Sequence, residues 1–174
     1  MAEDQQSVSP FWRFSLQFYR MPGVADACIA LQDEAGVDVN LLLFLLWNAS
    51  LGRQLSRADV EDVERQVAEW REGVVIPLRE LRRHLKFPPS LIHKDAAEAY
   101  RTRIKRVELE AERLQQEALF ALAQAAPPGR PALDGQAVAR NNVTAYQEIS
   151  PKRFSQAAVE TLLSAFGEVS DRSQ

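Results

Sequence analysis

The sequence predicts an all-α protein, and three observations support that fold class. Seven consecutive apolar residues, Leu41 to Trp47, stand in a chain in which 26% of the residues are charged. Two longer segments, residues 60–85 and 97–122, repeat apolar residues at alternating spacings of three and four, which is the period of a helix face. No strongly periodic segment alternates every two residues, as a half-buried strand would. We therefore expect a long, kinked, antiparallel helical hairpin packed against a short N-terminal three-helix unit, with a C-terminal helical extension.

The length and composition indicate a globular protein with a sizeable core. The chain has 174 residues, of which 46% are hydrophobic. It contains one cysteine, Cys28, and no charged-then-apolar segment ahead of a cleavage site, so we expect neither a disulfide framework nor a signal peptide. As a helix, the apolar run spans only about 10 Å, whereas a bilayer core is about 30 Å thick. We expect a cytoplasmic protein without a transmembrane segment.

Proline content divides the chain. A core domain is expected at residues 9–126, a proline-rich linker at residues 127–135 and a C-terminal helical extension at residues 136–167. We expect residues 1–8 and 168–174 to be disordered.

The first two helices are predicted from their ends. Ser9 suits an N-cap and Pro10 suits the first helical position, so a helix is expected from Pro10 to about Arg20. A second helix is expected at about residues 24–35, ended by Gly36. The first helix has two adjacent faces that should be buried. These faces carry Phe11, Phe14 and Phe18, and Trp12, Leu16 and Tyr19, respectively.

The third helix is the predicted centre of the core. A helix that is apolar on all sides must be covered on all sides, so Leu41 to Trp47 should be buried. Asp38 is the expected N-cap, because its carboxylate can accept hydrogen bonds from the free N–H groups of the first turn. Gly52 fits the position just after the helix.

The first arm of the hairpin is expected from Arg57 to Lys86. Ser56 fits its N-cap, and Asp59 fits the third helical position of a capping box. Pro77 lies inside the arm, and its ring would strike the carbonyl group of Gly73. We therefore expect a kink between these two residues.

A proline-rich elbow at residues 87–90 joins this arm to a second, antiparallel arm, expected from Leu91 to Ala126. Beyond the linker, residues 136–149 are a weak helix candidate, because the Asn and Thr residues within them favour other conformations. The last helix is expected to start at Ser150-Pro151 and to end at Gly167. The predicted apolar seam of the second arm contains Ala97, Tyr100, Ile104, Val107, Ala111, Leu114, Ala118 and Leu122.

Catalytic motifs are scarce. The sequence has no Gly-x-x-x-x-Gly-Lys phosphate loop, no Gly-x-Gly-x-x-Gly after a strand, no nucleophile elbow and no His-Glu-x-x-His pair. His84 and His93 flank the elbow, where basic neighbours disfavour a metal ion. Cys28 lies on an apolar stripe, which favours a buried, inert thiol. We expect no catalytic residue, metal or cofactor, and we favour a non-enzymatic protein, with a small helical enzyme as the alternative.

Basic residues concentrate around the elbow. Residues 79–106 carry nine Lys or Arg against three acidic residues, whereas the rest of the chain carries twelve basic and twenty-one acidic residues. Such a positive tip could attract phosphates, nucleic acid or an acidic partner, and it is a candidate docking site. We expect a protein partner, or a second copy of the chain, to bind through helical surfaces. Nucleic acid is less favoured, because Phe87 and Tyr100 are too few aromatic residues for a stacking platform. A solvated helix end is the competing interpretation. The predicted binding residues are Arg79, Arg82, Arg83, Lys86, Lys94, Arg101 and Arg103.

A second candidate site surrounds the start of the apolar helix. A carboxylate beside a hydrophobic core can act as an acid, a base or a ligand. A pocket between the aromatic first helix and the apolar third helix would then hold a small molecule. Helix capping and solvation of helix ends explain the same polar residues without a ligand. These residues are Gln32, Asp33, Asp38 and Asn40.

The first three helices carry the pattern FWRFSLxFY followed by PGVxxACxxLQDxxGxDVNLLLFxxW, over residues 11–47. This pattern resembles the start of a bacterial family that carries only a domain-of-unknown-function label. The resemblance is dense over residues 11–52, looser to about residue 114, and does not extend beyond Pro127. It implies a cytoplasmic bacterial protein, and no activity, cofactor or catalytic residue comes with it.

Overall fold

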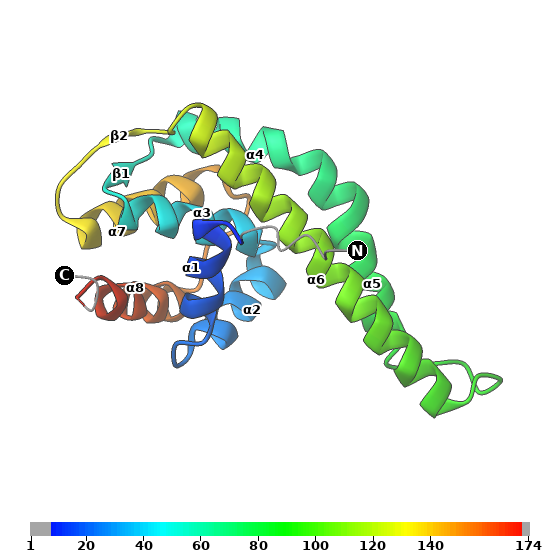
Figure 1. Ribbon diagram of the computed structural model, residues 1–174. Helices are drawn as coiled ribbons and strands as arrows, with labels where there is room; N and C mark the ends of the chain where they lie inside the picture. Colours follow the sequence, from blue (N-terminus) through cyan, green and yellow to red (C-terminus); the bar gives the residue numbers. More distant parts are fainter. Residues whose placement is uncertain (1–7, 172–174) are drawn as a thin grey trace.

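The computed structural model describes residues 8–171, and within them the protein is all-α apart from a two-stranded ribbon (Figure 1). The predicted fold class is therefore confirmed. The predicted disorder falls outside the described residues at 1–7 and 172–174, whereas residues 168–171, for which disorder was also predicted, belong to the last helix. The helices are α1 (Pro10–Tyr19), α2 (Val24–Ala35), α3 (Val39–Ser50), α4 (Arg57–Trp70), the π-helical turn η1 (Arg71–Val75), α5 (Ile76–His84), α6 (Lys94–Ala125), α7 (Gly135–Ile149) and α8 (Gln156–Asp171), and the antiparallel strands are β1 (Arg53–Gln54) and β2 (Arg130–Pro131).

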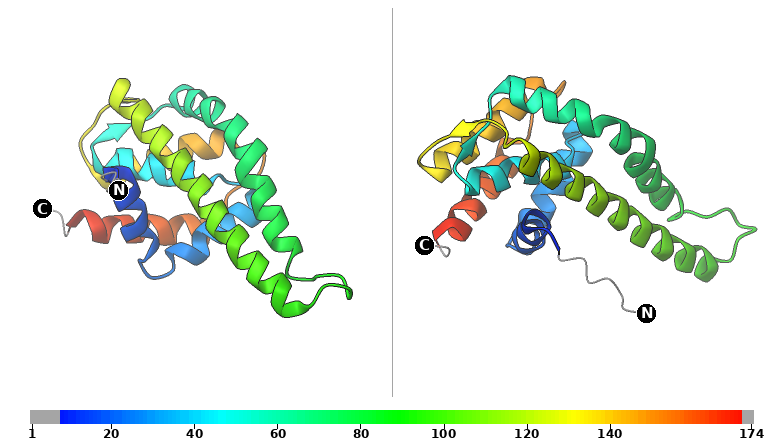
Figure 2. Two further views of the ribbon diagram at one scale, coloured as in Figure 1. Left: turned by 45° about the vertical axis from the view of Figure 1, so that its right-hand side comes forward. Right: turned by 45° about the horizontal axis from the view of Figure 1, so that its top comes forward.

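Helix α3 lies at the centre of the molecule, with α1, α6 and α7 packed against it (Figures 1 and 2). Every residue from Leu41 to Ala49 is buried, as expected of a helix that is apolar on all sides. The rings of Phe11 and Phe44 meet edge to face, with their centroids 5.5 Å apart, where α1 crosses α3. The predicted core helix is thus confirmed.

The predicted helix ends are confirmed where they depend on local hydrogen bonds. The hydroxyl group of Ser9 caps α1, the carboxylate of Asp38 caps α3, and Ser56 and Asp59 form a capping box at the start of α4. Gly52 follows α3 with a φ of 66°, a left-handed conformation that favours glycine.

Only one of the two predicted faces of α1 is fully packed. Phe11 and Phe18 are completely buried, whereas Leu16 and Tyr19 are 40% and 39% exposed. The second face lines an open cavity between α1 and α6.

The two C-terminal helices share one hydrophobic core with the rest of the chain. Helix α7 packs against α3, and α8 packs against α2. The buried amide of Asn142 donates to the carbonyl oxygens of Leu45 and Arg53, at 3.0 Å each, and accepts from the N–H group of Leu55 at 2.8 Å. These tertiary bonds explain why α7 forms although its sequence predicts only a weak helix.

The predicted limits of the last helix are wrong. Ser155, and not Ser150, precedes α8, and the helix continues through Gly167. The intervening loop is held by Phe154, which is buried with its ring centroid 5.5 Å from that of Tyr146. Because burial of this aromatic side chain fixes the loop, the helix does not begin at Ser150-Pro151, although a cap followed by proline is typical of a helix start.

The first arm of the hairpin runs without a break through α4, η1 and α5 (Figure 1). The predicted kink takes the form of a π-helical turn, in which the N–H group of Ile76 bonds to the carbonyl group of Arg71, five residues back. The wider turn lies just ahead of Pro77, whose ring would clash with the carbonyl of Gly73 in a regular α-helix. The chain bends here and does not end the helix.

The second arm, α6, begins at Lys94, so Leu91 and Ile92 remain in the elbow. The predicted seam of this arm is correct at Ala97 and Ala111, which are buried, but wrong in the middle. The residues wrongly assigned to it include Val107, Leu114 and Ala118, which are exposed. The side chains buried in this part of the arm instead include Glu108, Gln115 and Gln116. These polar groups are buried because partners on neighbouring elements satisfy them.

The linker after α6 is fixed to the strand that follows α3. The guanidinium group of Arg53 donates to three successive carbonyl groups, those of Pro127, Pro128 and Gly129, at distances of 2.6 to 3.0 Å. The backbone of Gly129 passes so close to β1 that an added Cβ atom would lie 2.2 Å from the carbonyl oxygen of Gln54.

Because of this close approach, Gly129→Ala should destabilise the fold. We expect the substitution to lower the free energy of unfolding by roughly 2 kcal/mol or more, measured by urea denaturation. Gly73→Ala is the matched control, because Gly73 is helical and an added Cβ would meet no atom within 4 Å. The control should be neutral or stabilise by up to about 1 kcal/mol. Equal losses in both variants would contradict the steric explanation.

The Cys28 thiol should be unreactive in the folded protein. It is fully buried, and burial raises its pKa to about 12, so the reactive thiolate is scarce near neutral pH. A colorimetric disulfide reagent should therefore react slowly with the folded protein and quickly in concentrated urea. Fast modification without denaturant would show that the thiol is accessible.

Candidate functional site

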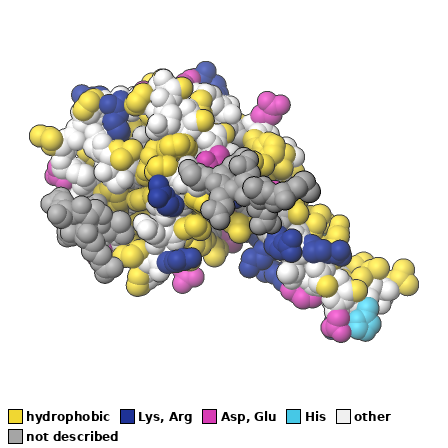
Figure 3. Space-filling view, in the orientation of Figure 1, with side chains coloured by type: hydrophobic (Ala, Val, Ile, Leu, Met, Phe, Trp, Pro, Cys, Tyr) yellow, Lys and Arg dark blue, Asp and Glu magenta, His cyan; other side chains and the backbone are white. Residues whose placement is uncertain are grey.

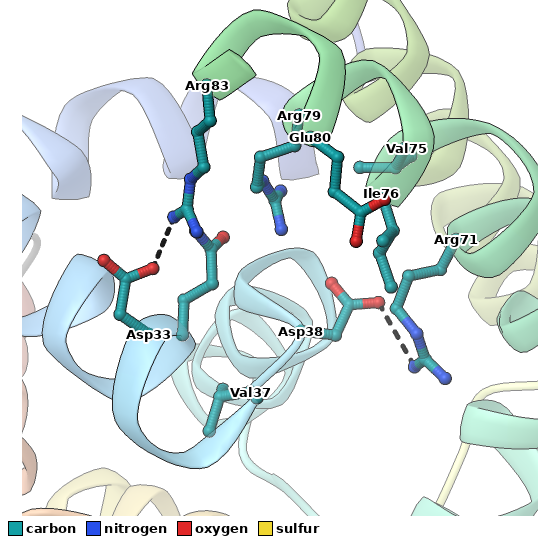
Figure 4. Close-up of a pocket in the computed structure, with 11 residues that line it drawn as sticks. Asp33, Val37, Asp38, Arg71, Val75, Ile76, Arg79, Glu80 and Arg83 are labelled. Carbon is teal, nitrogen blue, oxygen red and sulfur yellow. Dashed lines mark hydrogen bonds and ion pairs between the residues drawn. The ribbon is translucent and has the colours of Figure 1, made fainter. Parts of the chain in front are cut away.

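A charged cleft of about 200 Å³ lies between the α2–α3 turn and the first hairpin arm (Figure 4). We call it the Asp38 cleft. Asp33 and Asp38 line one side, and Arg71, Arg79 and Arg83 project from η1 and α5 on the other (Figure 4). Arg83 pairs with Asp33 near the surface, and the guanidinium group of Arg71 lies 3.6 Å from the carboxylate of Asp38. The cleft thus combines an exposed ion pair with a buried one.

Asp38 is compensated from three separate elements. Its Oδ1 caps α3, and its Oδ2 accepts a hydrogen bond from Nε2 of Gln115 at 2.6 Å. Arg71 supplies the nearby positive charge. The hydroxyl oxygen of Tyr146 accepts from the backbone N–H of Asp38 at 2.9 Å, and burial raises the pKa of this phenol. Asp38 is therefore both the predicted cap and the centre of a buried polar network.

The positive charge of Arg71 is stabilised by acidic residues of the same network. Burial of the guanidinium group opposes its charge, but its hydrogen bond and ion pair with Glu64, and the nearby Asp38 carboxylate, outweigh burial and raise its pKa. Arg71 is therefore a permanent cation beside the buried carboxylate.

Three side-chain amides continue the network away from Asp38. Nδ2 of Asn40 donates to Oε1 of Gln115 at 3.2 Å, and Nε2 of Gln116 donates to Oδ1 of Asn40 at 2.9 Å. With the bond from Gln115 to Asp38, these contacts form one directed chain, which we call the amide relay. All four of its side chains are buried. Because a carboxylate can only accept, Asp38 fixes the orientation of every amide in the relay.

A second buried cluster joins the two hairpin arms. Glu108, which is 5% exposed, accepts hydrogen bonds from both Arg79 and Arg82. Glu112 accepts from Arg79 at 2.9 Å, and burial raises the pKa of this carboxyl group although Arg79 opposes the shift. We call these four residues the ion-pair ladder. No residue of α5 is fully buried, so the ladder supplies the most buried side-chain contacts between α5 and α6.

A larger cavity, of about 530 Å³, lies among α1, α2, α3, α5 and α6. We call it the α1–α6 cavity. Of the polar residues predicted for a site here, Gln32 and Asn40 line this cavity, whereas Asp33 and Asp38 line the Asp38 cleft. Gln32 lines both spaces. The structure therefore divides the predicted polar site between two neighbouring hollows.

The predicted basic tip is also divided. Arg79 and Arg82 belong to the ion-pair ladder, and Arg83 pairs with Asp33 across the Asp38 cleft. The others lie nearer the elbow and are Lys86, Lys94, Arg101 and Arg103. Arg101 pairs with Glu98, and the guanidinium group of Arg103 lies over the ring of Tyr100, 5.3 Å from its centroid.

The hairpin projects away from the body of the protein, and hydrophobic side chains gather at its far end (Figures 2 and 3). Phe87 is 83% exposed, Leu91 is 91% exposed and Ile92 is 48% exposed. We call these three residues the apolar apex. Lys and Arg side chains lie behind it along the arm (Figure 3).

A family model described as "Protein of unknown function (DUF2390)" matches residues 10–119, more than half of the chain. The chain belongs to the DUF2390 family. The match spans α1 to α5 and most of α6, and so includes the amide relay, the ion-pair ladder and the apolar apex. No curated protein and no solved structure matches the chain.

In this DUF2390 protein the buried polar groups of the relay and the ladder pair mainly with one another. Within residues 8–171, no three His, Cys, Asp or Glu side chains gather as a metal site requires. His93 lies 3.8 Å from Asp95, and both side chains are largely exposed. The helices in the same part of the chain are all too short or too polar to cross a bilayer.

Several site residues of this DUF2390 protein, among them the four named next, are not predicted by the sequence pattern. Arg71, Glu108, Gln115 and Gln116 are polar positions in long helices, and apolar periodicity assigns such positions to the surface. The sequence contains one signal for the residues of α6, which is their helical spacing. Glu108 and Glu112 are four residues apart, and so are Gln115 and the apolar Leu119. This spacing places them along one face of α6.

Breaking the ion-pair ladder should weaken the hairpin. Glu108→Ala leaves Arg79 and Arg82, both largely buried, without their shared carboxylate, so we expect a loss of about 3 kcal/mol in the free energy of unfolding. Glu160→Ala is the control, because the Arg140–Glu160 pair is exposed and its loss should leave the melting temperature nearly unchanged. A Glu108→Ala variant that melts like the control would mean that the ladder does not stabilise the hairpin.

Proposed function

We propose that the chain is a cytoplasmic, non-enzymatic binding protein that docks a partner protein on the end of its hairpin. The observation that carries this proposal is the apolar apex, since Phe87 and Leu91 are more than four-fifths exposed. Large apolar side chains placed in water at the end of a projecting arm make no contribution to the core. Exposed clusters of this kind are typical of protein interaction sites.

The hairpin is built to hold the apex away from the body. Helices α5 and α6 continue beyond the core, joined by the ion-pair ladder, and the elbow extends past both (Figure 2). A binding loop on a rigid arm loses little conformational entropy when a partner binds. This geometry supports recognition by the elbow itself.

Charge around the apex favours a partner of opposite sign. Lys86, Lys94 and Arg103 are exposed nearby. A protein surface with an apolar pocket and an acidic rim fits this arrangement. A second copy of the chain would bring the same positive charges to the contact, so self-association through the apex is disfavoured. Nucleic acid is also disfavoured, because Phe87 and Tyr100 remain too few for base stacking.

The compartment is part of the proposal. The single cysteine is buried and forms no disulfide, which suits a reducing cytoplasm.

Removing the apolar apex should abolish partner binding without unfolding the protein. We expect the double variant Phe87→Ser/Leu91→Ser, tagged and purified from its native cell, to lose a stoichiometric protein partner that the parent retains. Once that partner is purified, the double variant should bind it about 30-fold or more weakly than the parent does, as expected for the loss of a central hot spot. The melting temperature should hardly change, because these side chains are already exposed.

Leu133→Ser is the matched control, because Leu133 is 94% exposed but lies in the segment before α7, far from the elbow in sequence. The control should keep the partner. If the double variant keeps it too, the apex is not the docking site. Co-purification of a small molecule without any protein partner would contradict the proposed function.

A further inference from the structure

We propose that the α1–α6 cavity binds a small, uncharged, mostly apolar molecule that carries a hydroxyl or N–H donor. This site is separate from the hairpin end and does not depend on the proposed docking function. The cavity volume of about 530 Å³ falls within the range of about 300 to 1,000 Å³ common for small-molecule sites.

The walls of the cavity supply an apolar surface that the core leaves open. Trp12, Leu16 and Tyr19 project from α1 into the cavity opposite α6, and this face of the helix stays partly exposed. Leu43 and Leu109 contribute apolar surface from α3 and α6. A flat or compact apolar molecule would cover this surface.

Two buried polar atoms of cavity-lining residues have no hydrogen-bond partner within residues 8–171. They are Oγ of Ser15 and Oε1 of Gln116, and the two residues are only 4% and 3% exposed. Buried polar atoms are almost always paired, and leaving one unpaired costs about 1 to 3 kcal/mol. A ligand donor would remove this cost for the carbonyl oxygen of Gln116.

The amide relay determines which atom of Gln116 is left unpaired. Asp38 can only accept, so Gln115 turns its amino group to Asp38 and its oxygen to Asn40. Asn40 must then donate to Gln115 and accept from Gln116. Gln116 uses one hydrogen of its amino group in this bond, and its oxygen is the atom left without any partner. The structure therefore favours a ligand that donates a hydrogen bond.

The charged residues that line the cavity and are mostly buried cancel in charge. The ion-pair ladder contributes two arginines and two glutamates that already pair with one another. A charged ligand would have to compete with these pairs, whereas an uncharged one would leave them intact. Two further cations, Arg20 and Lys105, also line the cavity, and both are exposed to solvent.

Two naphthalene probes test the donor requirement directly. Naphthalen-2-ol carries a hydroxyl donor, and 2-methoxynaphthalene has a similar ring but no donor. Titration calorimetry of the full chain should show one saturable site for naphthalen-2-ol and about tenfold weaker binding of the methoxy compound. The absence of saturable binding of naphthalen-2-ol would overturn the proposed site. Tighter binding of naphthalene-2-carboxylate than of naphthalen-2-ol would overturn the uncharged ligand class.

The variant Leu16→Trp tests whether the probes bind in the cavity. Leu16 lines the cavity and is partly exposed, so a larger side chain should fill the space and reduce binding by about tenfold or more without disturbing the core. Leu114→Trp on the exposed face of α6 is the control, because Leu114 does not line the cavity. If the two variants bind naphthalen-2-ol equally, the probe sits elsewhere and the proposal fails.

Asp38→Asn tests the relay itself. The remaining side-chain oxygen should still cap α3, so the new amino group would face Gln115. Gln115, Asn40 and Gln116 would then each turn their amide group by 180° to keep their hydrogen bonds. As a result, Gln116 would offer an N–H donor, and not its oxygen, to the ligand. The preference for naphthalen-2-ol over 2-methoxynaphthalene should then fall from about tenfold to near onefold. A purely structural role for Asp38 would leave the preference unchanged. Circular dichroism of each variant establishes that it is folded, and an unchanged preference in a folded variant would overturn the relay.

Discussion

A carboxylate buried at the start of the most apolar helix is the constraint on which the rest of the structure depends. An uncompensated charge in such a place would cost several kcal/mol, because neither water nor a neighbouring dipole would replace its solvation. Asp38 is compensated by Gln115 from α6, by Arg71 from η1 and by the end of its own helix, while Tyr146 from α7 binds its backbone. One residue thus fixes the position of three elements around α3.

Structure that follows from local contacts could be predicted from the sequence. The caps at Ser9 and Asp38 lie within a few residues of the N–H groups that they bind, and the apolar run of α3 can only be buried. It was also correct that the long patterns form a kinked hairpin, since Pro77 leaves few alternatives.

Polar side chains that are buried by distant partners could not be predicted from the sequence. Periodicity treats Glu108 and Gln115 as surface residues, yet Glu108 is paired with Arg79, 29 residues away, and Gln115 with Asp38, 77 residues away. Such pairs cannot be found from spacing along one helix. The sequence therefore indicated Asp38 and Asn40 of the polar network but not the amides of α6 that complete it. It also placed two arginines in the basic tip, Arg79 among them, that are held inside the hairpin.

The contact between α3 and α7 has a consequence for how the protein is made. Asn142 in α7 binds the carbonyl group of Leu45, 97 residues earlier in the chain. A ribosome releases the chain from its N-terminus, at about 5 to 20 residues per second. The most apolar helix therefore leaves the exit tunnel many seconds before the helix that covers this side of it. Stable folding of the core must wait until α7 has been synthesised, and α3 is without this cover during that interval.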